Sequence, residues 1–273
     1  MPAPAFAIRP LRTHDELLAC VEMQRATWGR EFSDVVPPTI LKITQRLGGV
    51  TAGAFADDGS MLGFVFGMTG VEDGRVVHWS DMLAVRPQAR DLGVGRALKA
   101  WQREAVRAVG ARVIYWTYDP LQAKNAHLNL AALGARVVEY VEDMYGTTDS
   151  DLHRGIGTDR FVVAWDVGDD APLPHAYSDA DAAAAVPLNP RAPESPRDLA
   201  SLLGSRPPLV RVEIPRDIGA VQRTSLDDAA RWRASTRAAF TAALARGYVV
   251  RGFVRGGDAG RGSYLLAPSD RHA

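Results

Sequence analysis

The chain has 273 residues, and its 47% hydrophobic content is enough for one large or two modest domains with a sizeable core. Its 32 basic residues balance 32 acidic ones, so no net charge draws it to nucleic acid or a membrane surface, and we expect neither as a partner. No secretory leader or apolar run of about 18 residues is apparent, so we expect a cytoplasmic protein that acts on small molecules.

The first elements in chain order are a short strand and two helices. A capping box formed by Thr13 and Glu16 predicts that the first helix begins at about His14. Cys20, the only cysteine, falls in the apolar pattern of this helix, so we expect a buried, unreactive thiol. The predicted elements are a strand at residues 6–8 and helices at 14–27 and 38–47.

Strands and two further helices follow over the next 120 residues or so. A short Asp-Gly connection at 57–60 joins two apolar runs, which is a strong signal for a hairpin. Residues 94–109 carry apolar side chains at helical spacing. The predicted strands are 50–56, 61–69, 76–85, 111–118, 136–145 and 161–167, and the predicted helices are 94–109 and 121–133.

The composition changes after residue 167. Residues 168–207 are rich in Ala, Asp and Pro with almost no aromatic residues, which indicates a linker. A strand, a helix and a hairpin follow, and this order repeats part of the first half of the chain. They are predicted at 209–214, 227–246, and 248–254 paired with 263–267. We therefore expect a first domain at 1–167, a linker at 168–207 and a small C-terminal unit at 208–273.

A loop with the sequence Arg90-Asp91-Leu92-Gly93-Val94-Gly95 leads into the helix at 94–109. Glycines at a helix start let backbone N–H groups close on an anion, and the helix dipole and Arg90 add positive charge, so the loop suits a diphosphate. A P-loop is excluded because no Gly-Lys-Ser or Gly-Lys-Thr follows. A Rossmann dinucleotide site stays open as an alternative, although Leu98 occupies the position of its third glycine.

The pattern Arg-x-x-Gly-x-Gly between a strand and a long amphipathic helix resembles the acyl-coenzyme A signature of the GNAT superfamily of N-acyltransferases. Residues 6–167 resemble that superfamily in element order as well. The resemblance implies an α/β (α+β) fold with a mixed, mostly antiparallel sheet flanked by helices. It also implies that an acetyl or other short acyl group moves from acetyl-CoA or another short acyl-CoA to a primary amine of a small molecule, such as an amino acid, without a metal.

Further segments resemble a bacterial GNAT subgroup of predicted acetyltransferases. They are residues 116–121, residues 152–160 and the appended C-terminal unit. Some relatives of that subgroup are linked to succinyl transfer to amino acids, so the acyl group stays open between acetyl and succinyl.

The resemblance also implies which residues contact acyl-CoA. The strand before the loop would pair with the pantetheine arm and the loop would hold the pyrophosphate. In addition, Asn125 and Asn129 lie four residues apart in a predicted helix, which places them on one face toward the pantetheine or the substrate. The expected acyl-CoA contacts are Met82, Leu83, Ala84, Val85, Arg90, Leu92, Gly93, Val94, Gly95, Arg96, Asn125 and Asn129.

The catalytic groups are less well specified. Asp81 or His78 would act as the general base, and catalysis by positioning alone is an alternative. Many family members place an acidic tyrosine where this chain has Leu130, so Tyr118 or Tyr145 would have to supply the proton. This departure keeps open a second hypothesis, a module that binds acyl-CoA or a protein partner without catalysis.

Four arginines are candidates for binding an acidic acyl group such as succinyl. They are Arg154, Arg160, Arg233 and Arg237. The last two share one edge of the helix at 227–246, where pairing with nearby acids is the favoured interpretation. The sequence leaves open whether the C-terminal unit forms a homodimer or covers the site.

Overall fold

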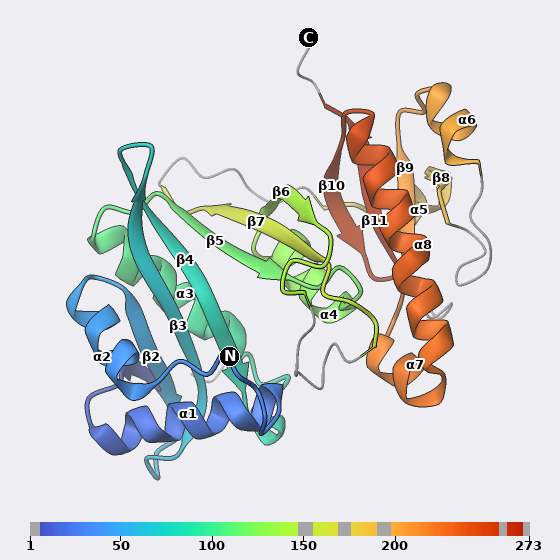
Figure 1. The fold of residues 1–273 in the computed structure, drawn as a ribbon. Coiled ribbons are helices and arrows are strands. Elements are labelled where there is room, and N and C mark those ends of the chain that lie inside the picture. The colour runs from blue at the N-terminus through green and yellow to red at the C-terminus, as the bar shows by residue number, and fades with distance from the viewer. Residues whose placement is uncertain (1–5, 147–154, 169–175, 190–197, 257–260, 270–273) are drawn as a thin grey trace. The chain divides into compact units, whose positions relative to one another are not determined.

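The structure is a computed structural model that describes residues 6–146, 155–168, 176–189, 198–256 and 261–269 (Figure 1). Its strands form a seven-stranded sheet in the order β1-β2-β3-β4-β5-β7-β6 and a four-stranded sheet in the order β10-β11-β9-β8. The first sheet is mostly antiparallel, with β4 and β5 running parallel. The prediction of a mixed, mostly antiparallel sheet followed by a smaller C-terminal α/β unit is confirmed.

The chain divides into two compact units, which are described separately. The first comprises Met1–Trp116, Asp149–Asp151 and Asp166–Ala171, and the second comprises Thr117–Thr148, Leu152–Trp165 and Pro172–Ala273. No helix within the described ranges has the length and apolar character needed to cross a bilayer.

The elements of the first unit match the predicted order. They are β1 (Ala7–Pro10), α1 (His14–Trp28), α2 (Pro38–Arg46), β2 (Val50–Phe55), β3 (Met61–Glu72), β4 (Arg75–Val85), the 3₁₀ turn η1 (Pro87–Ala89), α3 (Val94–Ala108) and the start of β5 (Val113–Tyr118). The capping box at Thr13 and Glu16 is present, and α2 begins on a proline as expected. Local signals therefore place these helices to within a residue or two.

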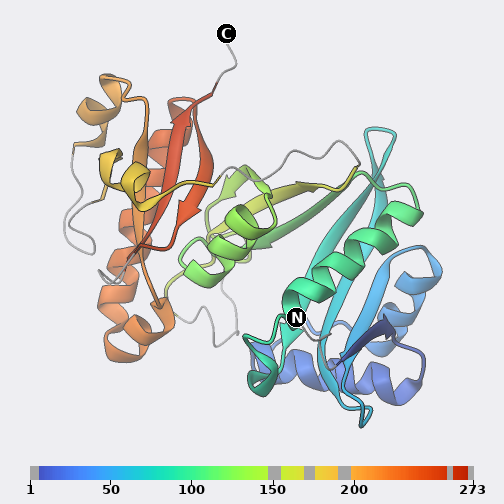
Figure 2. The same ribbon diagram turned by 180° about the vertical axis from the view of Figure 1, so that it is seen from behind.

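Helices cover both faces of the first unit's sheet. Helices α1 and α2 lie on one face and α3 lies on the other, as Figures 1 and 2 show from opposite sides. The core on the α1 side includes Cys20, Leu41, Phe64 and Phe66, all at most 1% exposed. Cys20 is buried as predicted, and burial raises the pKa of its thiol to about 12.

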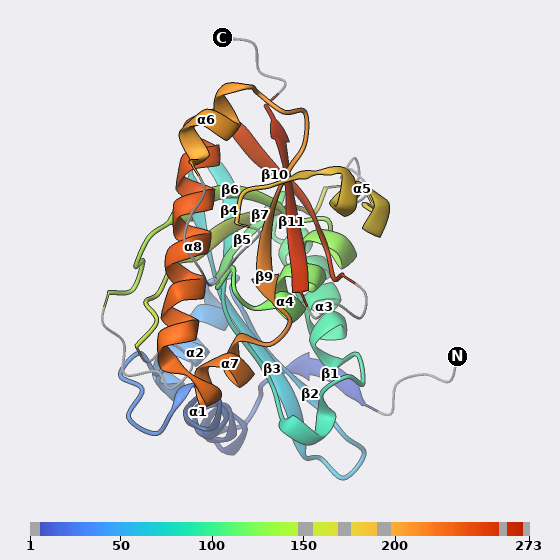
Figure 3. The same ribbon diagram turned by 90° about the vertical axis from the view of Figure 1, so that its right-hand side faces the viewer.

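The second unit holds the end of β5 and the remaining elements (Figure 3). They are α4 (Ala123–Ala126), the π-helix η2 (His127–Ala132), β6 (Arg136–Val141), β7 (Arg160–Asp166), α5 (Asp179–Ala184), β8 (Val186–Pro187), α6 (Leu199–Gly204), β9 (Val210–Pro215), α7 (Ile218–Thr224), α8 (Leu226–Ala245), β10 (Tyr248–Val254) and β11 (Arg261–Pro268). The predicted order of strand, long helix and hairpin is present in β9, α8, β10 and β11.

Three local differences from the sequence predictions have physical causes. The segment interpreted as a linker contains α5, β8 and α6, because Ser178 and Asp198 cap short helices there and β8 pairs with β9. Helix α7, which was not predicted, is capped by Asp217. The helix expected at 121–133 is short, and it widens into a π-helix in which the amide of Leu133 donates to the carbonyl of Leu128.

Candidate functional site

Strand β4 has an edge that its neighbour does not cover. It pairs with β3 along its whole length, but its parallel register with β5 extends only over His78 opposite Ile114 and Trp79 opposite Tyr115. From Ser80 onward the strands separate, so the backbone groups on that edge of β4 have no ladder partner in β5. Such an edge is suited to pairing with an extended ligand.

A β-bulge interrupts β4 at the point of separation. Met82 lies opposite Phe66 and Ser80 lies opposite Gly67, which leaves Asp81 without an opposing residue. A bulge redirects side chains and is common next to active sites. Asp81 is exposed at this position, whereas Met82 and Ala84 are buried in the core on the α1 side.

The loop between β4 and α3 ends in a helix start that no side chain caps. Gly93 is the N-cap residue in a left-handed conformation (φ +80°), and neither a capping hydrogen bond nor an acidic residue is present in the first turn of α3. Arg90 and Arg96 are exposed beside it, as is Leu92. The N-terminus of this 15-residue helix thus combines backbone N–H groups that its N-cap residue leaves uncapped with two cations, as an anion site requires.

The two glycines of the loop are there for different reasons. Gly93 needs its positive φ, which other residues adopt at a cost. At Gly95, a Cβ atom would lie 3.6 Å from Leu83 and 3.7 Å from Val85, which are ordinary contacts. The fold itself therefore does not require glycine at position 95, and close approach of a ligand to the backbone is the remaining physical reason.

His78, one of the two predicted bases, has no access to a substrate. It is fully buried, with Thr69 Oγ1 2.9 Å from Nδ1 and Gln102 Nε2 3.0 Å from Nε2. Because the Thr69 hydroxyl donates to the carbonyl of Gly48, Nδ1 must carry the proton and Nε2 accepts from Gln102. Burial, together with the charge of Lys99, lowers the pKa of His78 to about 4. Burial and these two partners favour a structural role for His78 and disfavour it as the base.

Asp81, in contrast to His78, is exposed and has a raised pKa. Desolvation around its carboxyl group and the nearby negative charge of Asp34 raise its pKa, although the residue as a whole keeps an exposed surface. An interaction with the side chain of Trp79 opposes this shift. A carboxylate with a raised pKa at an exposed bulge is a suitable proton acceptor near neutral pH.

The two candidate acids differ in accessibility. The hydroxyl of Tyr118 is buried and meets no hydrogen-bond partner with acceptable geometry among the described residues, although Tyr264 lies close enough to influence its pKa. Burial raises that pKa further above its ordinary value. Tyr145 is 48% exposed, and its hydroxyl lies 2.9 Å from Thr117 Oγ1. Of the two, only Tyr145 can meet a solvent-borne substrate.

The predicted pair of asparagines does not share an exposed face. Asn125 is exposed in α4, whereas Asn129 is buried in η2. Leu130, at the position where many GNAT members have a tyrosine, is also buried. The wider turn of the π-helix accounts for the difference from the α-helical spacing that the sequence suggested.

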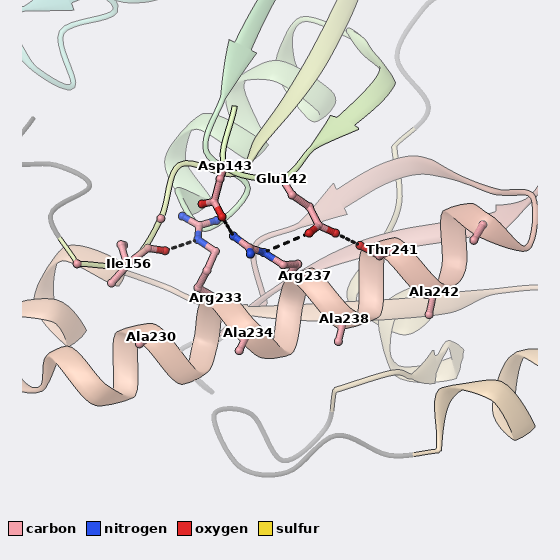
Figure 4. A pocket seen from close by; sticks show the side chains of 13 residues that line it. Glu142, Asp143, Ile156, Ala230, Arg233, Ala234, Arg237, Ala238, Thr241 and Ala242 are labelled. Atoms are coloured by element: carbon pink, nitrogen blue, oxygen red, sulfur yellow. Dashed lines mark hydrogen bonds and ion pairs between the residues drawn. The ribbon is translucent and has the colours of Figure 1, made fainter. Parts of the chain in front are cut away.

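A cavity of about 740 Å³ lies along α8, entirely within the second unit (Figure 4). Figure 4 shows Arg233 and Arg237 pointing from α8 toward Asp143 and Glu142. Four alanines at four-residue spacing form another strip of its wall, namely Ala230, Ala234, Ala238 and Ala242.

The arginines of this cavity wall are occupied by ion pairs. Arg233 is 5% exposed and donates from Nη2 to both carboxylate oxygens of Asp119 at 2.8 Å, and from Nε to the carbonyl of Ile156. Arg237 binds Asp159 and, at 2.9 Å, Asp143. These contacts support the structural interpretation of both arginines over a role in binding an acidic acyl group.

The other two arginines proposed for an acidic acyl group give no better site. Arg160 is buried, with its guanidinium 5.1 Å from the ring centre of Tyr145 and a hydrogen bond to the carbonyl of Asp159. Arg154 lies outside the described residues.

Sequence reasoning missed a buried polar group beneath the candidate site. Lys99 and Gln102 of α3 are 5% and 0% exposed, and they contact Ser80 and His78 of β4. Helical spacing contained the signal, because these two positions lie three residues apart beside the buried positions 98 and 106.

Comparisons with known proteins give similarity at the level of structure alone. No protein-family model matches the chain, and no curated protein matches it significantly. The ribosomal-protein-S18-alanine N-acetyltransferase from Escherichia coli matches at 18% identity and a TM-score of 0.46, over 62% of this chain and 99% of its own. An acetyltransferase of the GNAT family from Streptococcus pneumoniae matches at 17% identity and a TM-score of 0.47, over 60% of this chain and 99% of its own.

A third similar structure is that of the NatC complex bound to Gag peptide and CoA. It matches at 14% identity and a TM-score of 0.47, over 59% of this chain and 98% of the matched chain. These three similarities concern structure at low sequence identity, and each extends over about 60% of this chain. Assignment to the bacterial subgroup stays a prediction.

Proposed function

We propose that the protein is an acyl-coenzyme A-dependent N-acyltransferase, which moves an acetyl or other short acyl group to a primary amine of a small molecule. The observation that carries the proposal is the pairing of two features in one unit, the uncapped N-terminus of α3 and the separated edge of β4 directly before it. The N-terminus of α3 suits the diphosphate of coenzyme A, and the edge of β4 suits its extended, amide-containing pantetheine arm.

The residues present fit acyl-CoA. The N-cap residue Gly93 has no side chain that could cap the first backbone N–H groups of α3, and Gly95 leaves the approach to them open. Arg90 would add a charge-assisted contact to the pyrophosphate. The edge of β4 from Met82 to Val85 would pair with the pantetheine, and acyl-CoA, when bound, would supply a thioester for an amine to attack.

The chain's own contribution to the reaction is proton removal and orientation. We assign Asp81 as the base that takes the proton of the attacking amine, directly or through water. The thiolate has an ordinary pKa of about 8.5, which makes it a fair leaving group without a dedicated acid in this unit. Catalysis then depends mainly on holding the amine near the thioester.

Release of free thiol tests the proposal. Acetyl-CoA and succinyl-CoA would each be incubated with a panel of amino acids and other primary amines, alongside calorimetric titration with CoA. We expect CoA binding, and thiol release with at least one amine that Asp81→Asn slows by about 100-fold. Asp57→Asn, in the exposed turn between β2 and β3, is the matched control and should leave CoA binding and the rate of thiol release unchanged.

The alternative, a binding module without catalysis, makes a different prediction from the same measurements. It is favoured by the burial of Leu130 at the position of the family's tyrosine. CoA binding without thiol release across the whole panel would select this alternative, and failure to bind CoA would reject both.

A further inference from the structure

Lys99 projects from α3 into the interior of the first unit. Its Nζ donates to Ser80 Oγ at 2.8 Å and lies 4.0 Å from the ring centre of Trp116. The side chain is 5% exposed, and among the described residues no carboxylate contacts it. A buried ammonium whose partners are a hydroxyl and an indole ring is unusual, because buried lysines are normally paired with an acid.

The two partners of Lys99 occupy a special place in the sheet. The parallel register of β4 and β5 ends with Trp79 opposite Tyr115, so Ser80 and Trp116 would form the next pair. The strands separate at this position instead. The ammonium therefore joins the two side chains at the first position where the backbones no longer pair, one residue before the bulge at Asp81.

This arrangement does not favour the fold. Desolvation of an ammonium costs more than one hydroxyl and one aromatic ring are expected to return, and an apolar side chain of similar length would fill the same space at no such cost. Ionisable groups kept in the interior without a charge partner are concentrated at functional sites.

We propose that Lys99 is a positioning residue for acyl transfer, which holds β4 and β5 apart through Ser80 and Trp116 and thereby fixes the edge of β4 and the bulge at Asp81. The inference rests on the proposed function for its consequence in catalysis. Its geometric part, a charged contact between Lys99 and Trp116, is independent of that function and can be measured in the protein alone.

The ionisation of Lys99 offers a distinctive signature. Burial lowers the pKa of Lys99 to about 7, so the ammonium that binds Ser80 and Trp116 is lost as the pH rises above neutrality. The other titratable groups nearby are His78 of β4, which is neutral above its pKa of about 4, and Arg103, one turn further along α3. His78 therefore stays neutral near pH 7. The carboxyl group of Asp81, next to Ser80, also has a raised pKa, so the transition is assigned to Lys99 only if it persists in Asp81→Asn.

Three variants test the proposal through kinetics and stability together. Lys99→Met should lower kcat/KM for acyl transfer by about 100-fold, as expected for misplaced reacting groups, without lowering the denaturation midpoint in urea. Lys99→Arg keeps a permanent cation, so its kcat/KM should exceed that of Lys99→Met, and its ratio to wild type should rise as the pH passes through about 7. Lys42→Met, at an exposed lysine of α2, is the control and should change neither quantity.

Tryptophan fluorescence tests the geometric part without any cosubstrate. The contribution of Trp116 is the difference between spectra recorded with and without Trp116→Phe in the same background. This difference should titrate near pH 7 in the wild-type background and show no such transition in the Lys99→Met background. Absence of this transition in the wild type would overturn the inference while leaving the proposed function intact.

The kinetic outcomes are equally decisive. Lys99 would have no positioning role if kcat/KM of Lys99→Met equalled that of the wild type at every pH. The same conclusion would follow if its loss of activity came with a lower denaturation midpoint in urea. Failure of the wild type to bind CoA would reject the proposed function alone, and the fluorescence titration would still report on the Lys99 contact.

Discussion

The carboxyl group of Asp81 shows how a single neighbour adjusts a candidate base. Burial and the charge of Asp34 both raise the pKa of Asp81. Replacing Asp34 with asparagine removes one of these two causes, so the pKa of Asp81 should fall. Because the base must be unprotonated to act, the acid limb of the pH profile of kcat/KM should move to lower pH in Asp34→Asn.

The measurement for this prediction is kcat/KM for thiol release between pH 4 and 9 in the wild type and in Asp34→Asn. Asp57→Asn, in the exposed β2–β3 turn, should leave the profile unchanged. An acid limb that stays in place in Asp34→Asn would show that another group controls proton removal.

A second residue-scale prediction concerns the ion pair of Arg233 and Asp119, whose side chains are 6% and 2% exposed. Removing Arg233 takes from the buried carboxylate of Asp119 its bidentate ion pair, so Arg233→Met should lower the free energy of unfolding of the second unit by about 3–5 kcal/mol. The double variant with Asp119→Asn should recover much of that loss. Urea denaturation of the wild type and the two variants checks this, and equal stability of the single and double variants would contradict it.

At the scale of elements, the two glycines of the loop before α3 should affect different properties, Gly93 the stability and Gly95 the binding of CoA. Gly93→Ala places a side chain in the left-handed region and should lower stability by about 1 kcal/mol. Gly95→Ala lies in the first turn with room for a Cβ atom, so it should leave stability unchanged or raise it by up to about 1 kcal/mol. We nevertheless expect Gly95→Ala to weaken CoA binding by about tenfold or more, because the methyl group obstructs the helix N-terminus.

Thermal denaturation and calorimetric titration with CoA give the two quantities for each glycine variant. The proposed site requires that Gly95→Ala lowers the affinity for CoA without lowering the stability. Unchanged CoA affinity in Gly95→Ala would place the pyrophosphate elsewhere.

Elements with strong local signals could be predicted from the sequence. The capping box at Thr13 and the helical stripe of α3 give boundaries within about two residues of those observed, and the Asp-Gly hairpin gives the start of β3. Elements without such signals were missed or misread. Helix α7 depends on one capping aspartate, and the π-helix η2 depends on a backbone hydrogen bond that no residue pattern specifies.

The candidate site was predictable only where its chemistry belongs to the backbone. The glycine loop carries its own signature, whereas the role of His78 depends on partners at positions 69 and 102 in two other elements. Arg233 and Asp119 are 114 residues apart, so their pairing could not be read from spacing. The bulge at Asp81 arises from register between β3 and β4, which the sequence does not display.

At the scale of the whole molecule, the two compact units should respond differently to acid. His78 lies in the first unit, and burial lowers its pKa to about 4, against about 6.5 in an unfolded chain. Between these pH values the unfolded chain binds more protons than the folded chain, so the free energy of unfolding rises with pH. The contribution of His78 to stability is therefore lost as the pH falls from about 6.5 to about 4. The loss is at most about 3 kcal/mol.

The second unit has its principal acid-sensitive groups at lower pH. Burial alone would raise the pKa of Asp159, but hydrogen bonds from Arg237, Tyr140 and the amide of Asp143 outweigh it, so that pKa is lowered. Its contribution to stability is therefore present above about pH 4, the ordinary value for aspartate, and disappears only below it. His127 has a pKa shifted in the same direction as that of His78, but it is partly exposed, so its contribution is small.

Hydrogen exchange read by mass spectrometry can follow the two units separately, since each peptide reports the opening of its own segment. Between pH 6.5 and 4.5, we expect the free energy of opening, corrected for intrinsic exchange rates, to fall for peptides from β3 and α3 and to change little for those from α8 and β11. His14→Gln, at an exposed histidine of the first unit, should not alter this pattern. Equal losses in both units over this range would mean that the acid response belongs to the chain as a whole and not to His78.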